Sequence, residues 1–135
     1  MSGLVLKLGP HERIMINGVV MENGDRRARL NVLTPEATVL RLRDAIHPDE
    51  ANTPVRRVCY IAQLVLAGEA DPEEAAGQLE RGIGQLAQVF QDAESRGHLD
   101  GAAAAVAERR FYQAMRALRC LLPREARLLA YRVAS

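Results

Sequence analysis

The chain has 135 residues, of which 48% are hydrophobic and 26% charged, and its formal net charge is +1. This composition is typical of a globular protein with one domain or two small coupled units. No run of about 18 uncharged apolar residues occurs, and the N-terminus lacks the basic-then-apolar pattern of a signal peptide, so we expect a cytoplasmic protein without a membrane partner.

Five short strands are predicted in the first third of the chain. They span residues 4–8, 13–16, 19–22, 26–33 and 37–42. Asn17-Gly18 is the dipeptide that most readily forms the tight turn of a hairpin, and the proline turn Thr34-Pro35-Glu36 precedes the last strand. Because short turns join consecutive strands, we expect a five-stranded antiparallel meander. A sheet of this size is too small to stand alone, so a second chain or the helices must complete it.

The remainder of the chain predicts an antiparallel helical bundle. Thr53-Pro54 combines an N-cap residue with a proline at the first helical position, and the helix that follows is nearly all apolar as far as Ala67. A second helix begins at Asp71-Pro72, a loop is expected from Ser95 to Gly101, and an alanine-rich third helix follows. Apolar residues recur along the second and third helices at steps of three and four, at Leu79, Ile83, Leu86, Phe90 and Ala93 and at Ala107, Phe111, Ala114, Leu118 and Leu121. Two seams of matching period indicate an antiparallel pair of helices.

The predicted fold class is therefore α+β, with a β-rich subdomain at residues 1–46 and a helical subdomain at residues 47–135. A final short helix is expected from Pro123 onward. Its inward-facing residues are predicted to be Ala126, Leu129 and Val133.

Charge is distributed unevenly along the chain. Residues 1–47 carry a net +2, residues 48–101 a net −6 and residues 102–135 a net +5. One interpretation is that the acidic middle and the basic tail neutralise each other, within one helical unit or across a dimer. The other is that the basic parts form a face for RNA or an acidic partner.

Signatures of catalysis and of metal binding are absent from the sequence. His11, His47 and His98 are far apart and have no neighbours at metal-ligand spacing, and the many carboxylates fit the solvated faces of capped helices. Cys59 and Cys120 lie in apolar helical patterns, which predicts buried reduced thiols. We expect no catalytic residue, no metal site, no cofactor and no enzymatic activity.

Arginine supplies 17 of the 18 basic side chains, with Lys7 as the one lysine. Its planar guanidinium binds phosphates and base edges and stacks on bases, although a GC-rich genome also favours arginine. Basic residues cluster on the predicted strands, where single-stranded RNA is often bound, and the candidates for RNA binding are Lys7, Arg27, Arg29, Arg41 and Arg43. A second basic set shares one face of the third helix and is a candidate for partner binding, namely Arg109, Tyr112, Arg116 and Arg119.

Four blocks of sequence, in order, resemble the flagellar biosynthesis repressor FlbT family of alphaproteobacteria. They are residues 6–14 (LKLGPHERI), 53–64 (TPVRRVCYIAQL), 111–119 (FYQAMRALR) and 121–125 (LLPRE). The resemblance implies a protein that associates with the 5′ untranslated region of flagellin mRNA and promotes its decay, with the companion protein FlaF acting in opposition.

Residues 4–46 also resemble the RNA-binding carbon storage regulator CsrA, a five-stranded protein. Thr34-Pro35-Glu36 before the last strand and Arg43-Asp44-Ala45-Ile46 after it are similar to that family's Ala-Pro turn and Arg-Glu-Glu-Ile close. The resemblance implies that Arg43, and more loosely Lys7, contacts RNA, and that two chains exchange strands. The first strand here carries a lysine where that family usually has arginines, so the family's GGA preference is not carried over.

Two hypotheses follow. The first is a dimeric, non-catalytic repressor that binds the flagellin mRNA leader through its β-rich third. The alternative is a protein–protein adaptor or chaperone-like regulator that engages flagellin, FlaF or an assembly factor through a helical groove. The glycines Gly77, Gly82 and Gly84 and the apolar run from Val58 to Leu66 favour the alternative.

Overall fold

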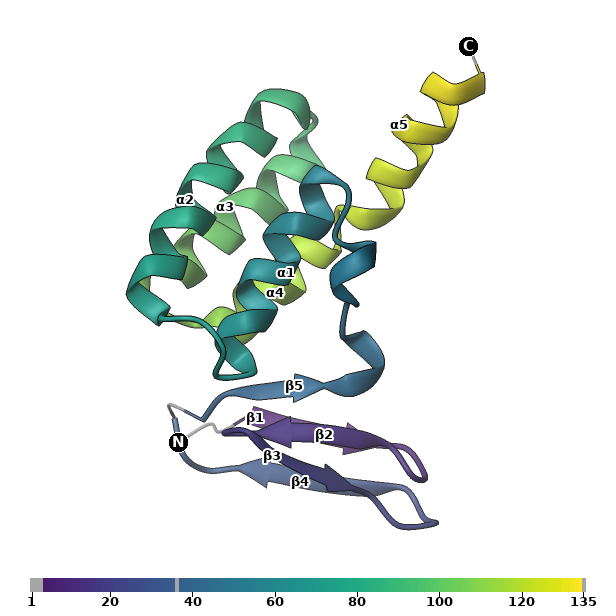
Figure 1. The fold of residues 1–135 in the computed structure, drawn as a ribbon, viewed down its shortest axis with the longest axis vertical. Helices are drawn as coiled ribbons and strands as arrows, with labels where there is room; N and C mark the ends of the chain where they lie inside the picture. The colour runs from purple at the N-terminus through teal and green to yellow at the C-terminus, as the bar shows by residue number, and fades with distance from the viewer. Residues whose placement is uncertain (1–3, 36, 135) are drawn as a thin grey trace.

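The computed structural model describes residues 4–35 and 37–134, and the side chains of residues 4–35 and 37–131. The fold is α+β, with the strands at one end of the molecule and a body of helices at the other (Figure 1). The strands are β1 (Leu4–Leu8), β2 (Arg13–Ile16), β3 (Val19–Glu22), β4 (Ala28–Val32) and β5 (Val39–Arg41). The 3-10 turns η1 (Leu42–Asp44) and η2 (Pro48–Glu50) connect them to the helices α1 (Pro54–Leu66), α2 (Pro72–Val89), α3 (Ala93–Ala107), α4 (Phe111–Arg119) and α5 (Leu122–Ala134).

The predicted strands are present, but the predicted meander is wrong. β1 pairs with β4, and β2 pairs with both β3 and β5, so the strands form two small antiparallel sheets. Only the hairpin at Asn17-Gly18, where both residues have positive φ, joins consecutive strands as expected. Two sheets bury each other's apolar faces, since Leu6 and Leu8 from one pack with Ile14 and Val39 of the other. A single flat sheet would leave one of these faces in water.

β5 lies between the other strands and the helices (Figure 1). Successive strand residues point to opposite faces, and two neighbouring residues of β5, Val39 and Leu40, are both buried. Val39 packs in the strand cluster, whereas Leu40 packs in the helical core. The helices therefore cover the outer face of β5, and within one chain they complete part of the small sheet.

Helix α1 begins as predicted, because the Thr53 side chain accepts a hydrogen bond from the Arg56 N–H and Pro54 follows it. The loop expected from Ser95 to Gly101 is wrong, since these residues lie inside α3. The chain breaks earlier, at residues 90–92, where Asp92 caps α3 by accepting from the Ser95 N–H. Here the cap decides the boundary, because the exposed glycines that suggested a loop weaken a helix without ending it.

The alanine-rich helix predicted after that loop is also interrupted. Arg109 has a φ of 60° and separates α3 from α4. The predicted seam is buried after the break, at Phe111, Ala114, Leu118 and Leu121, whereas Ala107 before the break is exposed. The predicted core positions are therefore right only from Phe111 onward. α1 packs against α2 and α4, and α3 packs against the same two helices.

Helix α5 projects from the helical body (Figure 1). Its first turn is anchored by the buried carboxylate of Glu125, which accepts hydrogen bonds from the Thr53 hydroxyl and the Val55 N–H of α1. The predicted inward orientation of Ala126 and Leu129 is wrong, because both are exposed. The helix extends past its contact with α1, so no neighbouring element covers these positions. The Val133 side chain lies outside the described part.

The prediction for the cysteines is half right, since Cys59 is buried and Cys120 is exposed. Cys120 follows the last residue of α4, where the chain turns outward toward α5. Among the described helices, none has both the length and the apolar character needed to cross a membrane.

Candidate nucleic-acid interface

The solvent face of the β1–β4 sheet carries two of the predicted RNA-binding residues side by side. Lys7 and Arg29 are directly opposed in the antiparallel register, and both are exposed. Arg27, which immediately precedes β4, is also exposed. None of the three forms an ion pair with any part of the chain that the structure describes. They therefore form a basic strip with free charge.

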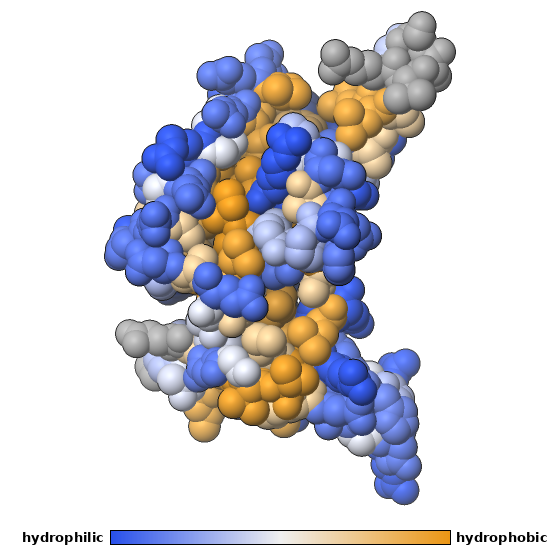
Figure 2. Space-filling view, in the orientation of Figure 1, coloured by the Kyte–Doolittle hydropathy of each residue, from blue (hydrophilic) through white to orange (hydrophobic). Residues whose placement is uncertain are grey.

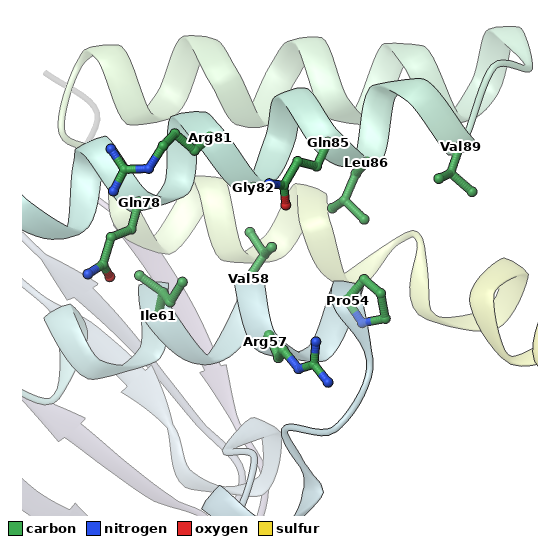
Figure 3. Close-up of a pocket in the computed structure, with 10 residues that line it drawn as sticks. All are labelled: Pro54, Arg57, Val58, Ile61, Gln78, Arg81, Gly82, Gln85, Leu86 and Val89. Carbon is green, nitrogen blue, oxygen red and sulfur yellow. The ribbon is translucent and has the colours of Figure 1, made fainter.

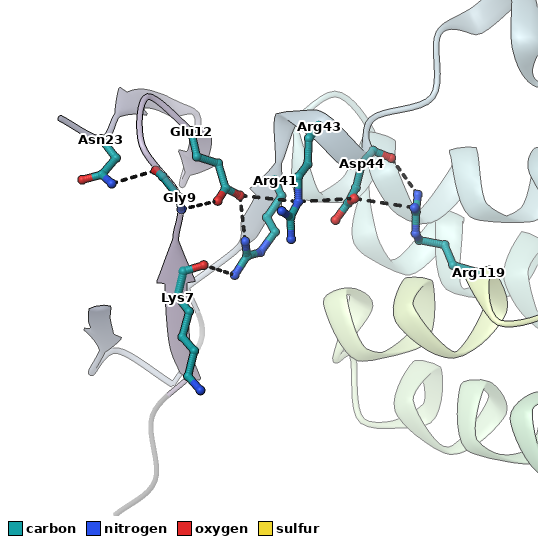
Figure 4. A network of polar contacts seen from close by, with 8 residues as sticks. All are labelled: Lys7, Gly9, Glu12, Asn23, Arg41, Arg43, Asp44 and Arg119. Atoms are coloured by element: carbon teal, nitrogen blue, oxygen red, sulfur yellow. Dashed lines mark hydrogen bonds and ion pairs between the residues drawn. The ribbon is translucent and has the colours of Figure 1, made fainter. Parts of the chain in front are cut away.

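Arg41 is also a predicted RNA-binding residue on a strand, but its environment differs from that of the exposed Lys7 and Arg29. Its side chain is only 11% exposed and lies beside the carboxylate of Glu12, with Nη1 at 2.7 Å from Oε2. Its Nη2 donates to the Lys7 carbonyl at 3.0 Å, so it joins β5 to β1 (Figure 4). The structure thus places Arg41 as a largely buried link between the two sheets, with Nη1 and Nη2 each donating to a partner within the chain.

Glu12 was not singled out by the sequence, and it is the centre of this network. Burial alone would raise the pKa of its carboxyl, but the hydrogen bond from the Gly9 N–H and the charge of Arg41 outweigh it and lower the pKa. Arg43 contributes more weakly, at 3.6 Å. Glu12 therefore stays ionised at neutral pH and holds two arginines at the end of β5.

Arg43 follows β5 in the turn η1, and its side chain is 64% exposed. Besides Glu12, the Asp44 carboxylate lies near it, at 3.8 Å. Both contacts are longer than a hydrogen bond, so its guanidinium donors are available to a ligand. In Figure 4 the Lys7 side chain points away from Arg43, so the two candidates lie on different sides of the Glu12 network.

Two of the four partner-binding candidates, Arg109 and Arg119, contact other residues of the chain. Arg109 lies between helices and binds the exposed Glu73 of α2, with Nη2 at 2.6 Å from the carboxylate. This contact lowers the pKa of Glu73. Arg119 donates to the Asp44 carbonyl at 2.8 Å and ties α4 to η1. Arg116 is exposed and Tyr112 is half-buried.

The helical body has a groove between α1 and α2, with a volume of about 440 Å³. Figure 2 shows apolar surface between these helices, and Figure 3 shows the lining side chains. We call it the α1–α2 groove, and it is lined by Pro54, Arg57, Val58, Ile61, Gln78, Arg81, Gly82, Gln85, Leu86 and Val89. Gly82 allows the close approach, since a Cβ there would lie 2.8 Å from Val58, whereas one at Gly84 would meet open space. The sequence indicated the glycines but not the two arginines of the walls.

Among the described residues, no three His, Cys, Asp or Glu side chains lie close enough together to hold one metal ion. Burial raises the pKa of the Cys59 thiol to about 12, so this cysteine is not a nucleophile at neutral pH.

Comparison with known proteins gives one consistent result. A family model described as "Flagellar protein FlbT" matches residues 4–129. A probable flagellum biosynthesis repressor protein FlbT from Allorhizobium ampelinum is 35% identical over 128 residues, covering 95% of this chain and 85% of that protein. The protein of the same description from Mesorhizobium japonicum is 32% identical over 93% of this chain and 84% of its own length. That from a Caulobacter species is 44% identical over 70 residues, 52% of this chain and 53% of its own length. No solved structure gives a significant match.

Proposed function

The chain belongs to the FlbT family of flagellar proteins, and on that premise we propose that it represses flagellin synthesis after transcription. In this proposal it binds the 5′ untranslated region of flagellin mRNA and promotes the decay of that message. It acts in the cytoplasm as a non-catalytic protein. Residues 1–46 contact the RNA, and residues 47–135 provide contacts to other proteins.

The observation that carries the proposal is the opposed pair Lys7 and Arg29. Like charges directly opposite each other destabilise an antiparallel sheet. No carboxylate in the described part of the chain neutralises them. An RNA backbone would supply the missing negative charge, because phosphates bind lysine and arginine side chains and release counterions.

The other candidates take distinct roles in this proposal. Arg27 extends the basic strip along β4, and Arg43 offers an exposed guanidinium to a phosphate or a base edge. Arg41 supports the site from within, because it is buried against Glu12.

The experiment is a titration of purified protein with a flagellin leader RNA, followed by fluorescence anisotropy at several salt concentrations. The double variant Lys7→Ala/Arg29→Ala should bind more weakly. Its plot of log affinity against log salt should be shallower by about 1.4, which corresponds to about 0.7 for each lost phosphate contact on a single strand. The matched control is Arg116→Ala/Arg127→Ala, which removes two exposed cations from α4 and α5.

An unchanged salt slope in the Lys7/Arg29 variant, or an equal loss in the control, would refute the assignment of this strip. Arg43→Ala should weaken the same complex by about 1–3 kcal/mol if its guanidinium contacts a base edge.

A homodimer is part of the proposal, and exposed apolar residues on α5 support it. Leu128, Leu129 and Tyr131 are 48%, 40% and 76% exposed. Sedimentation equilibrium should give the mass of two chains, and substituting these residues with serine should give that of one.

The second candidate function is an adaptor that engages flagellin, FlaF or another assembly protein, with any effect on mRNA being indirect. The α1–α2 groove favours it. Steep loss of RNA affinity with salt supports the first function, whereas copurification with a flagellar protein and no RNA affinity supports the second.

A further inference from the structure

The α1–α2 groove is as long as a short helix. Its α1 wall runs from Pro54 to Ile61 and its α2 wall from Gln78 to Val89. At a rise of 1.5 Å per residue, these walls are about 10 Å and about 16 Å long. The groove therefore matches two to three turns of a helix laid along it.

The floor of the groove is apolar and incompletely covered. Val58 and Leu86 are buried at its base, and Ile61 is half-buried. Val89, at one end, is 66% exposed. Covering such surface from water is favourable, at roughly 25 cal/mol per Å² of apolar area.

Two arginines rise from opposite walls, Arg57 from α1 and Arg81 from α2 (Figure 3). Both are exposed, and neither forms an ion pair with a residue that the structure describes. No carboxylate lines the groove. A groove lining without carboxylates is unusual in this part of the chain, because residues 48–101 carry ten acidic and only four basic side chains. The groove thus presents unneutralised positive charge within the most acidic part of the chain.

We propose that the α1–α2 groove binds an acidic amphipathic helix of a partner protein. The helix presents an apolar stripe to the floor and carboxylates on both flanks, which pair with Arg57 and Arg81. Grooves of this kind bind helices through apolar side chains spaced three and four residues apart. This inference goes beyond RNA binding, and it specifies the docking site that the adaptor function requires.

Charge argues against α5 of a second copy as the occupant. α5 also exposes apolar residues, but it carries Arg124 and Arg127. Seating it in the groove would place these arginines near Arg57 and Arg81, and like charges at an interface are unfavourable. An acidic helix would instead cover the apolar floor and place carboxylates beside Arg57 and Arg81.

The test uses the full-length protein and two fluorescein-labelled synthetic helices about 14 residues long, with identical leucine stripes. One probe has glutamates on both flanks of the stripe and the other has lysines. The acidic helix should bind at least about tenfold more tightly than the basic one. Arg57→Glu/Arg81→Glu should weaken binding of the acidic helix by about tenfold or more. The matched control Arg110→Glu/Arg127→Glu makes the same charge change at two exposed positions, at the start of α4 and on α5, that belong to no candidate site, and it should leave binding unchanged.

Each other outcome overturns the proposal. Equal binding of the two probes means that the groove selects apolar surface alone. Loss in the control and not in the groove variant places the contact on α4 and α5. A change of oligomeric state in the groove variant, measured by sedimentation, means that a second copy occupies the groove. Titration of all variants with the leader RNA separates this inference from the RNA-binding function, since the groove variant should retain its RNA affinity.

Discussion

Replacing Glu12 with alanine should destabilise the fold more than replacing its partner Arg41. Without Glu12, the largely buried guanidinium of Arg41 keeps only the Lys7 carbonyl, a neutral acceptor, among its described contacts. Without Arg41, the Glu12 carboxylate still accepts from the Gly9 N–H and still faces Arg43. The two variants remove one ion pair but leave different charges behind.

The expected magnitudes follow from burial. Removing one partner of a fully enclosed ion pair costs about 3–5 kcal/mol. Arg41 retains 11% exposure, so some water reaches the stranded cation, and we expect about 2–3 kcal/mol for Glu12→Ala. Arg41→Ala should cost about 1–2 kcal/mol, because a second arginine remains beside the carboxylate. The double variant should cost about as much as Glu12→Ala alone, which gives a coupling of about 1–2 kcal/mol.

The same pair predicts the direction of the pH dependence. The pKa of Glu12 is lowered in the folded state from an ordinary value of 4.5. A lowered folded pKa stabilises the fold above the ordinary value, and this contribution is lost as the pH falls through the folded pKa. The free energy of unfolding should therefore fall below about pH 4.5, and Glu12→Gln should reduce the part of that fall which this carboxyl contributes.

The assay is urea unfolding followed by circular dichroism, at neutral pH and at several values down to about pH 3.5. Additive effects within about 0.5 kcal/mol would show that the contact contributes no coupling. Equal destabilisation by the two single variants would contradict the larger cost expected when Arg41 loses its carboxylate. A Glu12→Gln variant with the same acid dependence as the parent would contradict the lowered pKa.

Three further predictions concern the helical body. Glu125→Ala should cost about 3 kcal/mol in urea unfolding, because it leaves a buried N–H of α1 without its charged acceptor. Gly82→Ala should destabilise by about 1–2 kcal/mol, since its Cβ would lie 2.8 Å from an α1 side chain, whereas Gly84→Ala meets open space and should stabilise by up to about 1 kcal/mol. Ellman's reagent should modify Cys120 in the folded protein and reach the fully buried Cys59 only after unfolding; two fast-reacting thiols would contradict this burial.

The sequence predicted the strands far better than their pairing. Short apolar runs bounded by turn residues are a local signal, and β1, β2 and β3 have the predicted bounds. Pairing depends on contacts distant in the chain. β1 pairs with β4, and β2 pairs with β5, in an arrangement that buries Leu6 and Val39 in one cluster. No local pattern in the sequence reveals that these two residues pack together.

The helix boundaries show how local signals compete. Asp71-Pro72 and Thr53-Pro54 were found because cap and proline coincide. Asp92 has no following proline, and the stretch from Ser95 to Gly101 with its two glycines predicts a loop where α3 runs. An N-cap residue fixes where a helix begins because its side chain accepts a hydrogen bond from a backbone N–H of the first turn. A glycine offers no such acceptor.

The candidate site shows the limit of composition as a guide. Arg41 and Arg43 lie two residues apart with the same chemistry, yet one is 11% exposed and the other 64%. Their difference comes from Glu12, 29 residues from Arg41 in sequence. A basic residue near a strand end is therefore a candidate for RNA binding from sequence alone. Whether its charge is available to a ligand depends on whether a carboxylate of the folded chain, such as Glu12, pairs with it.

The basic strip and the α1–α2 groove lie on different elements, and the contacts between those elements explain why each can be altered alone. The Gln63 side chain accepts from the Ile46 N–H and donates to its carbonyl, so α1 is fixed to the segment after β5. Arg119 fixes the same segment to α4. Lys7 and Arg57 are exposed and take no part in these ties. Charge changes at the strip or the groove should therefore leave the other surface in place, whereas changes within residues 39–46, which contact both cores, should affect both.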